Sequence, residues 1–125
     1  MIRFFGPDRH DAAWEETTRR RLEEGLLDMA MRVLALGLDV ILDFGVWSRS
    51  EREDFRSRAA AIGARSELHF VDAPLDELIR RLEARNAALP PGTYPITEQE
   101  MRAFATWLER PGEDELAPRE PGRPS

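Results

Sequence analysis

The stretch L-D-V-I-L-D-F at residues 38–44 decides the fold class. Its centre, residues 40–42, is a run of three aliphatic side chains, and such a run suits a strand that is covered on both faces of a parallel sheet. A second stretch of this kind, E-L-H-F-V-D, lies at residues 67–72. Between them, residues 49–62 predict a helix. Because a strand, a helix and a strand follow one another, the sequence indicates an α/β fold with a parallel sheet.

Further helices are expected on both sides of these strands. Residues 11–36 predict a long helix, and residues 74–88 predict a shorter one after Pro74. Thr97 and Glu100 form a capping box that starts a last helix. The long helix has apolar residues at helical spacing on one face, which we expect to be buried; they are Leu22, Leu26, Met29, Val33 and Leu36. For the helix over residues 49–62, two capping boxes fit equally well: Ser48 with Glu51, and Ser50 with Glu53.

The chain has the size of one domain. We expect residues 1–111 to form it, and residues 112–125 to be a disordered, polar and proline-rich tail. Two strands do not make a stable open sheet by themselves. The predicted architecture is therefore an incomplete parallel sheet, which another strand should complete.

Composition limits the possible functions. The chain has 125 residues, a formal net charge of −6 and a pI of about 5.0, so it repels nucleic acid and anionic membranes overall. Because it has no cysteine, disulfides, thiolate zinc sites and cysteine nucleophiles are excluded. It has two histidines. No apolar run suits a signal peptide or a membrane span. We expect a cytoplasmic protein.

Asp43 is the candidate catalytic residue, because functional groups gather where the strands of a parallel sheet end. A carboxylate there could position a magnesium-bound water or accept a proton from a substrate hydroxyl. The structural alternative is an aspartate that caps the turn before Gly45.

Two arginine clusters are candidate phosphate sites. Arg49, Arg52 and Arg56 lie at helical spacing near a helix start, where the helix dipole also favours anions, and Arg52 is the residue we single out. Arg81 and Arg85 lie one turn apart on the next helix, where both guanidinium groups could bind one phosphate. Surface pairing with nearby glutamates is the alternative for both clusters.

A phosphate-binding loop is missing from these residues. Such a loop needs G-x-x-x-x-G-K-[S/T], whose backbone amides and lysine hold the phosphates. No lysine stands in any motif of this kind, and no G-x-G-x-x-G follows a predicted strand. We therefore do not expect the chain to be a self-sufficient ATP enzyme.

Residues 37–109 nevertheless resemble P-loop kinases of the AAA-type ATPase superfamily, which are related to zeta-toxin, chloramphenicol phosphotransferase and polynucleotide kinase domains. The resemblance rests on residues 37–52, 68–86 and 94–104. It implies a three-layer, parallel-sheet P-loop NTPase-like fold, in which Asp43 ends the third strand and Arg52 faces the substrate. It also implies that Arg81 and Arg85 lie in a lid near the phosphates, and that the first strand and P-loop would precede Met1.

The resemblance implies ATP and Mg²⁺ as cofactors of the complete form, with phosphoryl transfer to a small molecule, and no cofactor for this chain alone. We also consider a non-enzymatic interaction or regulatory module derived from such a kinase. Because the missing strand would leave a gap at the centre of the sheet, unpaired strand edges could drive self-association. A third alternative, a nucleotide-independent enzyme that uses Asp43, lacks a nucleophile.

Overall fold

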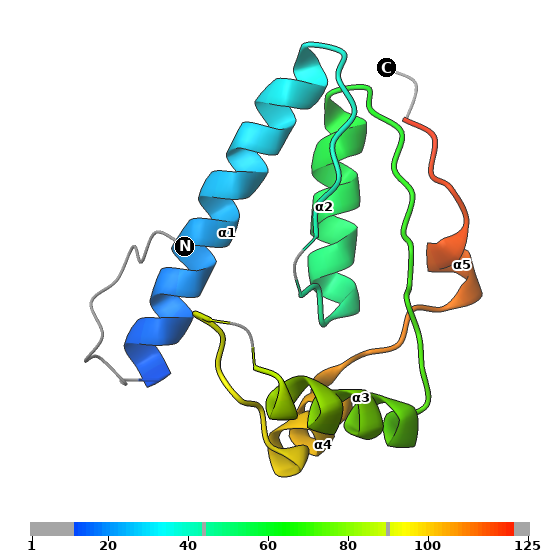
Figure 1. Ribbon diagram of the computed structural model, residues 1–125. Coiled ribbons are helices and arrows are strands. Elements are labelled where there is room, and N and C mark those ends of the chain that lie inside the picture. The colour runs from blue at the N-terminus through cyan, green and yellow to red at the C-terminus, as the bar shows by residue number, and fades with distance from the viewer. Residues whose placement is uncertain (1–11, 44, 90, 122–125) are drawn as a thin grey trace. The chain divides into compact units, whose positions relative to one another are not determined.

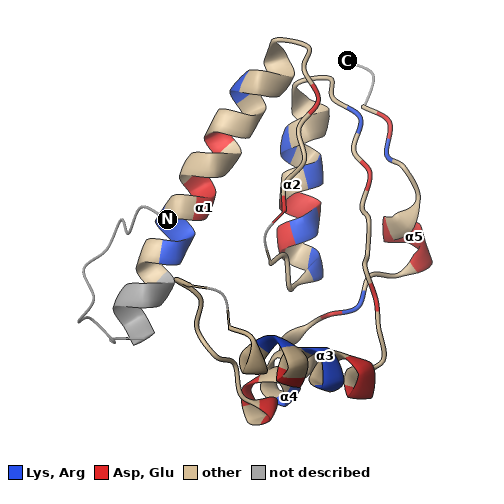
Figure 2. Ribbon diagram, viewed as in Figure 1, with Lys and Arg blue, Asp and Glu red and all other residues tan. Residues whose placement is uncertain are grey.

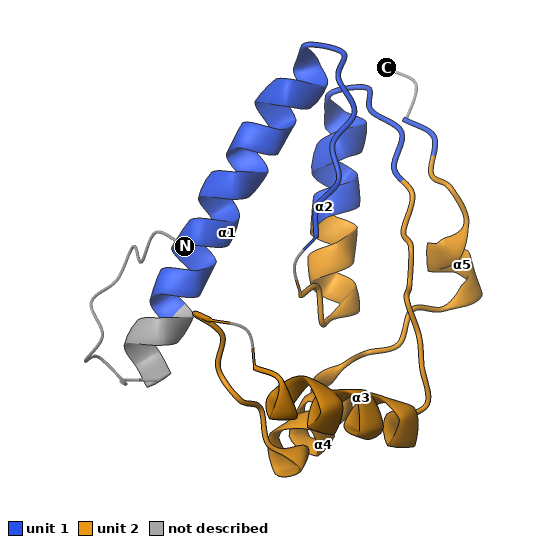
Figure 3. Cartoon of the chain, in the orientation of Figure 1, with its two compact units in different colours: residues 1–44, 55–66, 120–125 blue, residues 45–54, 67–119 orange. Residues whose placement is uncertain are grey.

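The computed structural model describes residues 12–43, 45–89 and 91–121, with side chains from residue 17 onward. These residues include the five helices α1 (Ala12–Ala35), α2 (Arg49–Ala61), α3 (Leu75–Ala87), α4 (Glu98–Trp107) and α5 (Glu113–Leu116) (Figure 1). The chain divides into two compact units, coloured separately in Figure 3. Unit 1 comprises residues 1–44, 55–66 and 120–125, and unit 2 comprises residues 45–54 and 67–119.

The four longer helices confirm the predicted ones to within a few residues at each end, because local capping signals determine where they begin and stop. At α2, Ser48 and Glu51 form the capping box: Glu51 N donates to Ser48 Oγ at 3.2 Å, and Ser48 N donates to Glu51 Oε2 at 3.0 Å. The predicted box of Thr97 and Glu100 is also present, at α4. Gly63 follows α2 with a φ of 78°, a left-handed conformation that glycine adopts without a steric cost.

The two predicted strands are not formed in the residues that the structure describes. Residues 38–43 and 67–73 have no regular secondary structure, and Phe44 lies outside the described residues. Ile41 is 91% exposed and Val71 is 95% exposed. An apolar strand of a parallel sheet is stable only when neighbouring strands satisfy its backbone and cover its side chains. The expected parallel sheet is therefore not confirmed for these two segments.

Unit 1 contains α1 and the second half of α2. Its buried apolar side chains are Leu27 and Ala30 of α1 and Ala59 of α2. An ion pair between Arg58 Nη1 and Glu24 Oε2, 3.1 Å apart, joins the two helices. The predicted buried stripe of α1 is wrong, since Leu22, Leu26, Met29 and Leu36 are exposed. The helix instead buries the adjacent face, on which Leu27 lies.

Unit 2 is built around the contact between α3 and α4. Ile79 and Leu82 of α3 are its buried apolar side chains. The side chain of Asn86 ties the end of α3 to the segment before α4: its amide donates to Ile96 O at 2.6 Å, and its oxygen accepts from Ile96 N at 3.4 Å. An aromatic contact connects α4 with the residues just before α2: the ring centroids of Trp47 and Phe104 lie 6.1 Å apart.

The described part of the expected tail contains a short helix. Residues 113–116 form α5, and Glu115 within it is buried. The expectation rested on a polar, proline-rich composition, but the carboxylates of this segment are bound by arginines elsewhere in unit 2, which gives it a fixed place. Residues 122–125 of the predicted tail, and the apolar residues 2–5, lie outside the described residues.

Candidate anion-binding site

Arg52 is the centre of the candidate site. Its guanidinium faces the carboxylate of Glu115 with two parallel hydrogen bonds, from Nε to Oε1 at 2.7 Å and from Nη2 to Oε2 at 3.1 Å. Both residues are almost fully buried, with 3% of Arg52 and 2% of Glu115 exposed. This is the two-point geometry by which arginine recognises carboxylates and phosphates. The sequence hypothesis that Arg52 could bind an anion thus has a structural counterpart, in which the anion is a side chain of the same protein.

The backbone at the start of α2 holds Arg52 in this orientation. Its remaining nitrogen, Nη1, donates to Val46 O at 3.4 Å and to Trp47 O at 3.3 Å. Glu51 accepts hydrogen bonds from the backbone amides of Trp47 and Ser48, at 3.1 and 3.0 Å, and so fixes the turn that carries these carbonyls. The guanidinium is therefore oriented by contacts that do not involve Glu115.

Residues 109–115 are tied to this turn by their backbone as well as by charge. Glu109 N donates to Trp47 O at 2.9 Å, and the Glu109 carboxylate accepts from Arg49 N at 2.9 Å. Gly112 N donates to Glu115 Oε2 at 3.1 Å, which aims the carboxylate at Arg52. Glu115 thus accepts hydrogen bonds from both the guanidinium and the main chain.

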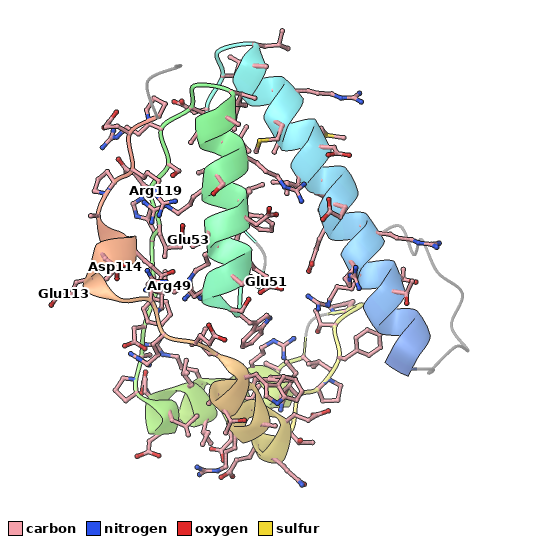
Figure 4. The ribbon with its side chains drawn as sticks, turned by 180° about the vertical axis from the view of Figure 1, so that it is seen from behind. Arg49, Glu51, Glu53, Glu113, Asp114 and Arg119 are labelled. Carbon is pink, nitrogen blue, oxygen red and sulfur yellow. The ribbon has the colours of Figure 1, made fainter. Side chains whose placement is uncertain are left out.

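Two further ion pairs surround this central one (Figure 4). Arg49 donates from Nη2 to Asp114 Oδ2, and its Nη1 lies 3.9 Å from Glu115 Oε2. Arg119 donates to Glu53 with two bonds of 2.8 Å each. Glu113, in contrast, points away from α2 in Figure 4. Because these outer pairs are partly exposed to solvent, each contributes little to stability.

The two α5 carboxylates that pair with arginines, Asp114 and Glu115, are ionised at neutral pH. The hydrogen bond from Arg52 lowers the pKa of Glu115 from 4.5 to about 2, against the opposing effect of burial. The hydrogen bond from Arg49 likewise lowers the pKa of Asp114 below its usual value. Arginine and carboxylate therefore both carry their full charge at neutral pH, and their attraction is strongest in the pH range where both remain ionised.

This arrangement predicts a specific acid dependence. Since the pKa of Glu115 is about 2 in the folded chain and 4.5 without its partners, its contribution to stability is complete above pH 4.5 and is lost as the pH falls toward 2. We expect the melting temperature of the wild type to fall over this range more steeply than that of Glu115→Gln, which has no carboxylate to protonate there. Parallel pH–melting curves for the two proteins measure the difference, and curves of equal slope would contradict the assignment.

The other predicted site residues each have their own surroundings. Arg81 pairs with Glu77 at 2.6 Å on the surface of α3, which is the arrangement of the structural alternative. Arg85 is exposed and forms no ion pair with the residues that the structure describes. Asp43 is also exposed and belongs to unit 1, whereas the three arginines belong to unit 2. The functional roles of Asp43, Arg81 and Arg85 stay predictions.

The sequence reasoning missed the acidic partners of the arginines. Composition places Asp114, Glu115 and Arg119 in a polar, proline-rich tail and marks none of them as a site residue. Figure 2 shows acidic residues on α5 and both charge signs along α2. The only available signal was this charge complementarity, since no spacing rule connects Glu115 with Arg52, 63 positions earlier in the sequence.

The residues of this chain do not fit ATP and Mg²⁺ bound in the P-loop manner. No G-x-x-x-x-G-K-[S/T] motif occurs among the 125 residues, and all 18 basic residues are arginines. Among the residues that the structure describes, no group of three or more histidine, aspartate and glutamate side chains could hold a metal ion. A P-loop ATP site would need the motif's backbone amides and lysine, which the 125 residues do not supply.

Comparison with known proteins defines the class. A family model described as an AAA domain matches residues 2–111, nearly the whole chain. The chain therefore belongs to this family of P-loop kinase-like AAA proteins, as its sequence predicted. No significant match was found among curated proteins or among solved structures.

None of the described helices has the length and apolar character that crossing a bilayer requires.

Proposed function

We propose that this chain forms the substrate-side part of a cytoplasmic kinase-like protein, which transfers a phosphoryl group from ATP to a small molecule with a hydroxyl group. The observation that carries the proposal is the family match over residues 2–111. Because a P-loop motif is absent from the 125 residues, a P-loop supplied by further sequence is required for ATP binding. The chain alone is then inactive.

Within this function the predicted residues keep distinct roles. Arg81 and Arg85 lie one turn apart on an exposed face of α3, where Arg85 is accessible to phosphate oxygens and Arg81 would exchange Glu77 for them. Asp43 is exposed at the end of an apolar segment and would accept the proton of the substrate hydroxyl. Arg52 would neutralise a phosphate group of the substrate, provided that Glu115 has left it.

Thermal melting with and without Mg-ATP tests the proposal. We expect no shift for the 125-residue chain, and a clear shift for a form that also carries an in-frame G-x-x-x-x-G-K-[S/T] segment encoded upstream of Met1. A ligand at 100 times its Kd adds about 2.7 kcal/mol to the stability of the folded state. A shift with the 125 residues alone would mean that arginines bind ATP without a P-loop. An unresponsive P-loop-bearing form would contradict the kinase function.

A second candidate is a non-enzymatic interaction or regulatory module. It is favoured by the exposure of large apolar side chains in segments that the sequence predicts to be strands, above all Ile41 and Val71. Exposed apolar segments of this kind are typical of surfaces that another chain covers. A stable oligomer of the purified chain that does not respond to ATP would distinguish this candidate from the kinase.

A further inference from the structure

We infer that residues 112–116 are an acidic latch, which occupies the arginine site at the start of α2 and must leave before a phosphate group can bind Arg52. The inference rests on the proposed role of Arg52 in binding phosphate, and it adds a competitor from within the same chain. The acidic latch is thus an autoinhibitory segment, and the free form of the site is the one that binds a ligand.

The first argument is geometric. The two Glu115 oxygens lie 2.7 and 3.1 Å from Nε and Nη2 of Arg52, the positions that two oxygens of a phosphate group would take on the same guanidinium edge. One edge cannot hold both anions. Because Nη1 of Arg52 is bound separately by the carbonyls of Val46 and Trp47, the guanidinium keeps its orientation when Glu115 leaves.

The second argument comes from the boundary of the family match. The match ends at residue 111, so Arg49 and Arg52 lie inside it and Asp114 and Glu115 lie outside it. The arginines therefore belong to the part of the chain that is common to the family. Their partners lie in residues that the family model does not match, and a segment outside the matched range can act as a regulator of a site within it.

The third argument is that charge, rather than apolar packing, holds the acidic latch. Glu115 is the only buried residue of α5, while Leu116 is 43% exposed. Asp114 contacts Arg49 at the surface, with both side chains more than half exposed. An element of four residues held in this way can be displaced by another anion, whereas one held by an apolar core could not.

The experiment compares phosphate binding to Arg52 with and without the two carboxylates. Asp114→Asn/Glu115→Gln removes both charges at nearly constant size, and Glu113→Gln is the matched control on the same helix, since Glu113 points away from α2. Inorganic phosphate is titrated into each protein, and the NMR signal of the Arg52 Nε–H group reports binding. We expect an apparent affinity at least tenfold higher in the double variant than in the wild type or Glu113→Gln. The indole signal of Trp47 confirms that the start of α2 stays folded.

The possible results separate the alternatives. Equal phosphate affinity in all three proteins would overturn the latch, as would a double variant whose Arg52 ignores phosphate while the Trp47 signal stays native. Repeating the titration with glucose 6-phosphate and with metal-free ATP shows whether the preferred phosphate belongs to a small molecule or to a nucleotide. The proposed kinase function has its own test in the Mg-ATP response of the P-loop-bearing form, so either idea can fail without the other.

Discussion

Replacing Glu115 with alanine should weaken the attachment of residues 109–119 by about 3–5 kcal/mol, since the change leaves the buried guanidinium of Arg52 without its counter-charge. Arg52 and Glu115 are 3% and 2% exposed, so water screens neither charge in the folded state. The loss is measured by amide hydrogen exchange of residues 109–119. The loss of amide protection in residues 109–119 should exceed that in α3 and α4, whose contact does not involve Glu115.

Two further variants show that charge is the cause. Glu113→Ala removes a neighbouring glutamate that points away from α2, and surface changes of this kind cost less than about 0.5 kcal/mol. Arg52→Met/Glu115→Leu replaces both buried charges with apolar groups and should recover most of the stability lost in Glu115→Ala, because neither ion then needs a partner. If the amides of residues 109–119 exchanged equally slowly in Glu115→Ala and in Glu113→Ala, the buried pair would contribute nothing to holding this segment.

The helices could be predicted from sequence because their signals are local. Ser48 with Glu51 and Thr97 with Glu100 act over three positions, and these capping boxes are found where the sequence indicates them. The strands depend on neighbours instead. Ile41 and Val71 have the apolar character of buried strand residues, yet both are exposed because no described strand lies beside them.

In the candidate site, too, the residue with a local sequence signal could be predicted and its distant partner could not. Arg52 could be found because an arginine near a helix start is a local pattern, and the family resemblance placed it on the substrate side. Glu115 could not, because its contact with Arg52 depends on how residues 109–115 return to the start of α2. Composition alone describes residues 112–125 as a polar tail, and it carries no information on the backbone bonds of Glu109 and Gly112 that bring the acidic latch to the arginines.

Leu27→Ala should destabilise the chain by about 2–5 kcal/mol, the cost of removing a large side chain from a packed interior. Leu27 is 0% exposed, and it is the largest apolar side chain that the described part of unit 1 buries completely. Urea unfolding followed by circular dichroism measures the loss. If the variant is already unfolded in buffer, the loss is at least the full stability of the wild type.

Leu26→Ala is the matched control, because the same deletion is made one residue earlier on the same helix. Leu26 is 42% exposed and belongs to the stripe that helical spacing had predicted to be buried. In the fold described here its truncation removes little buried area, so it should cost well under half as much as Leu27→Ala. A cost at Leu26 equal to that at Leu27 would show that the stripe is covered in solution. Since no described part of the chain covers it, the cover would then be a second copy or residues outside the described ranges, and a loss that grows on dilution would identify the second copy.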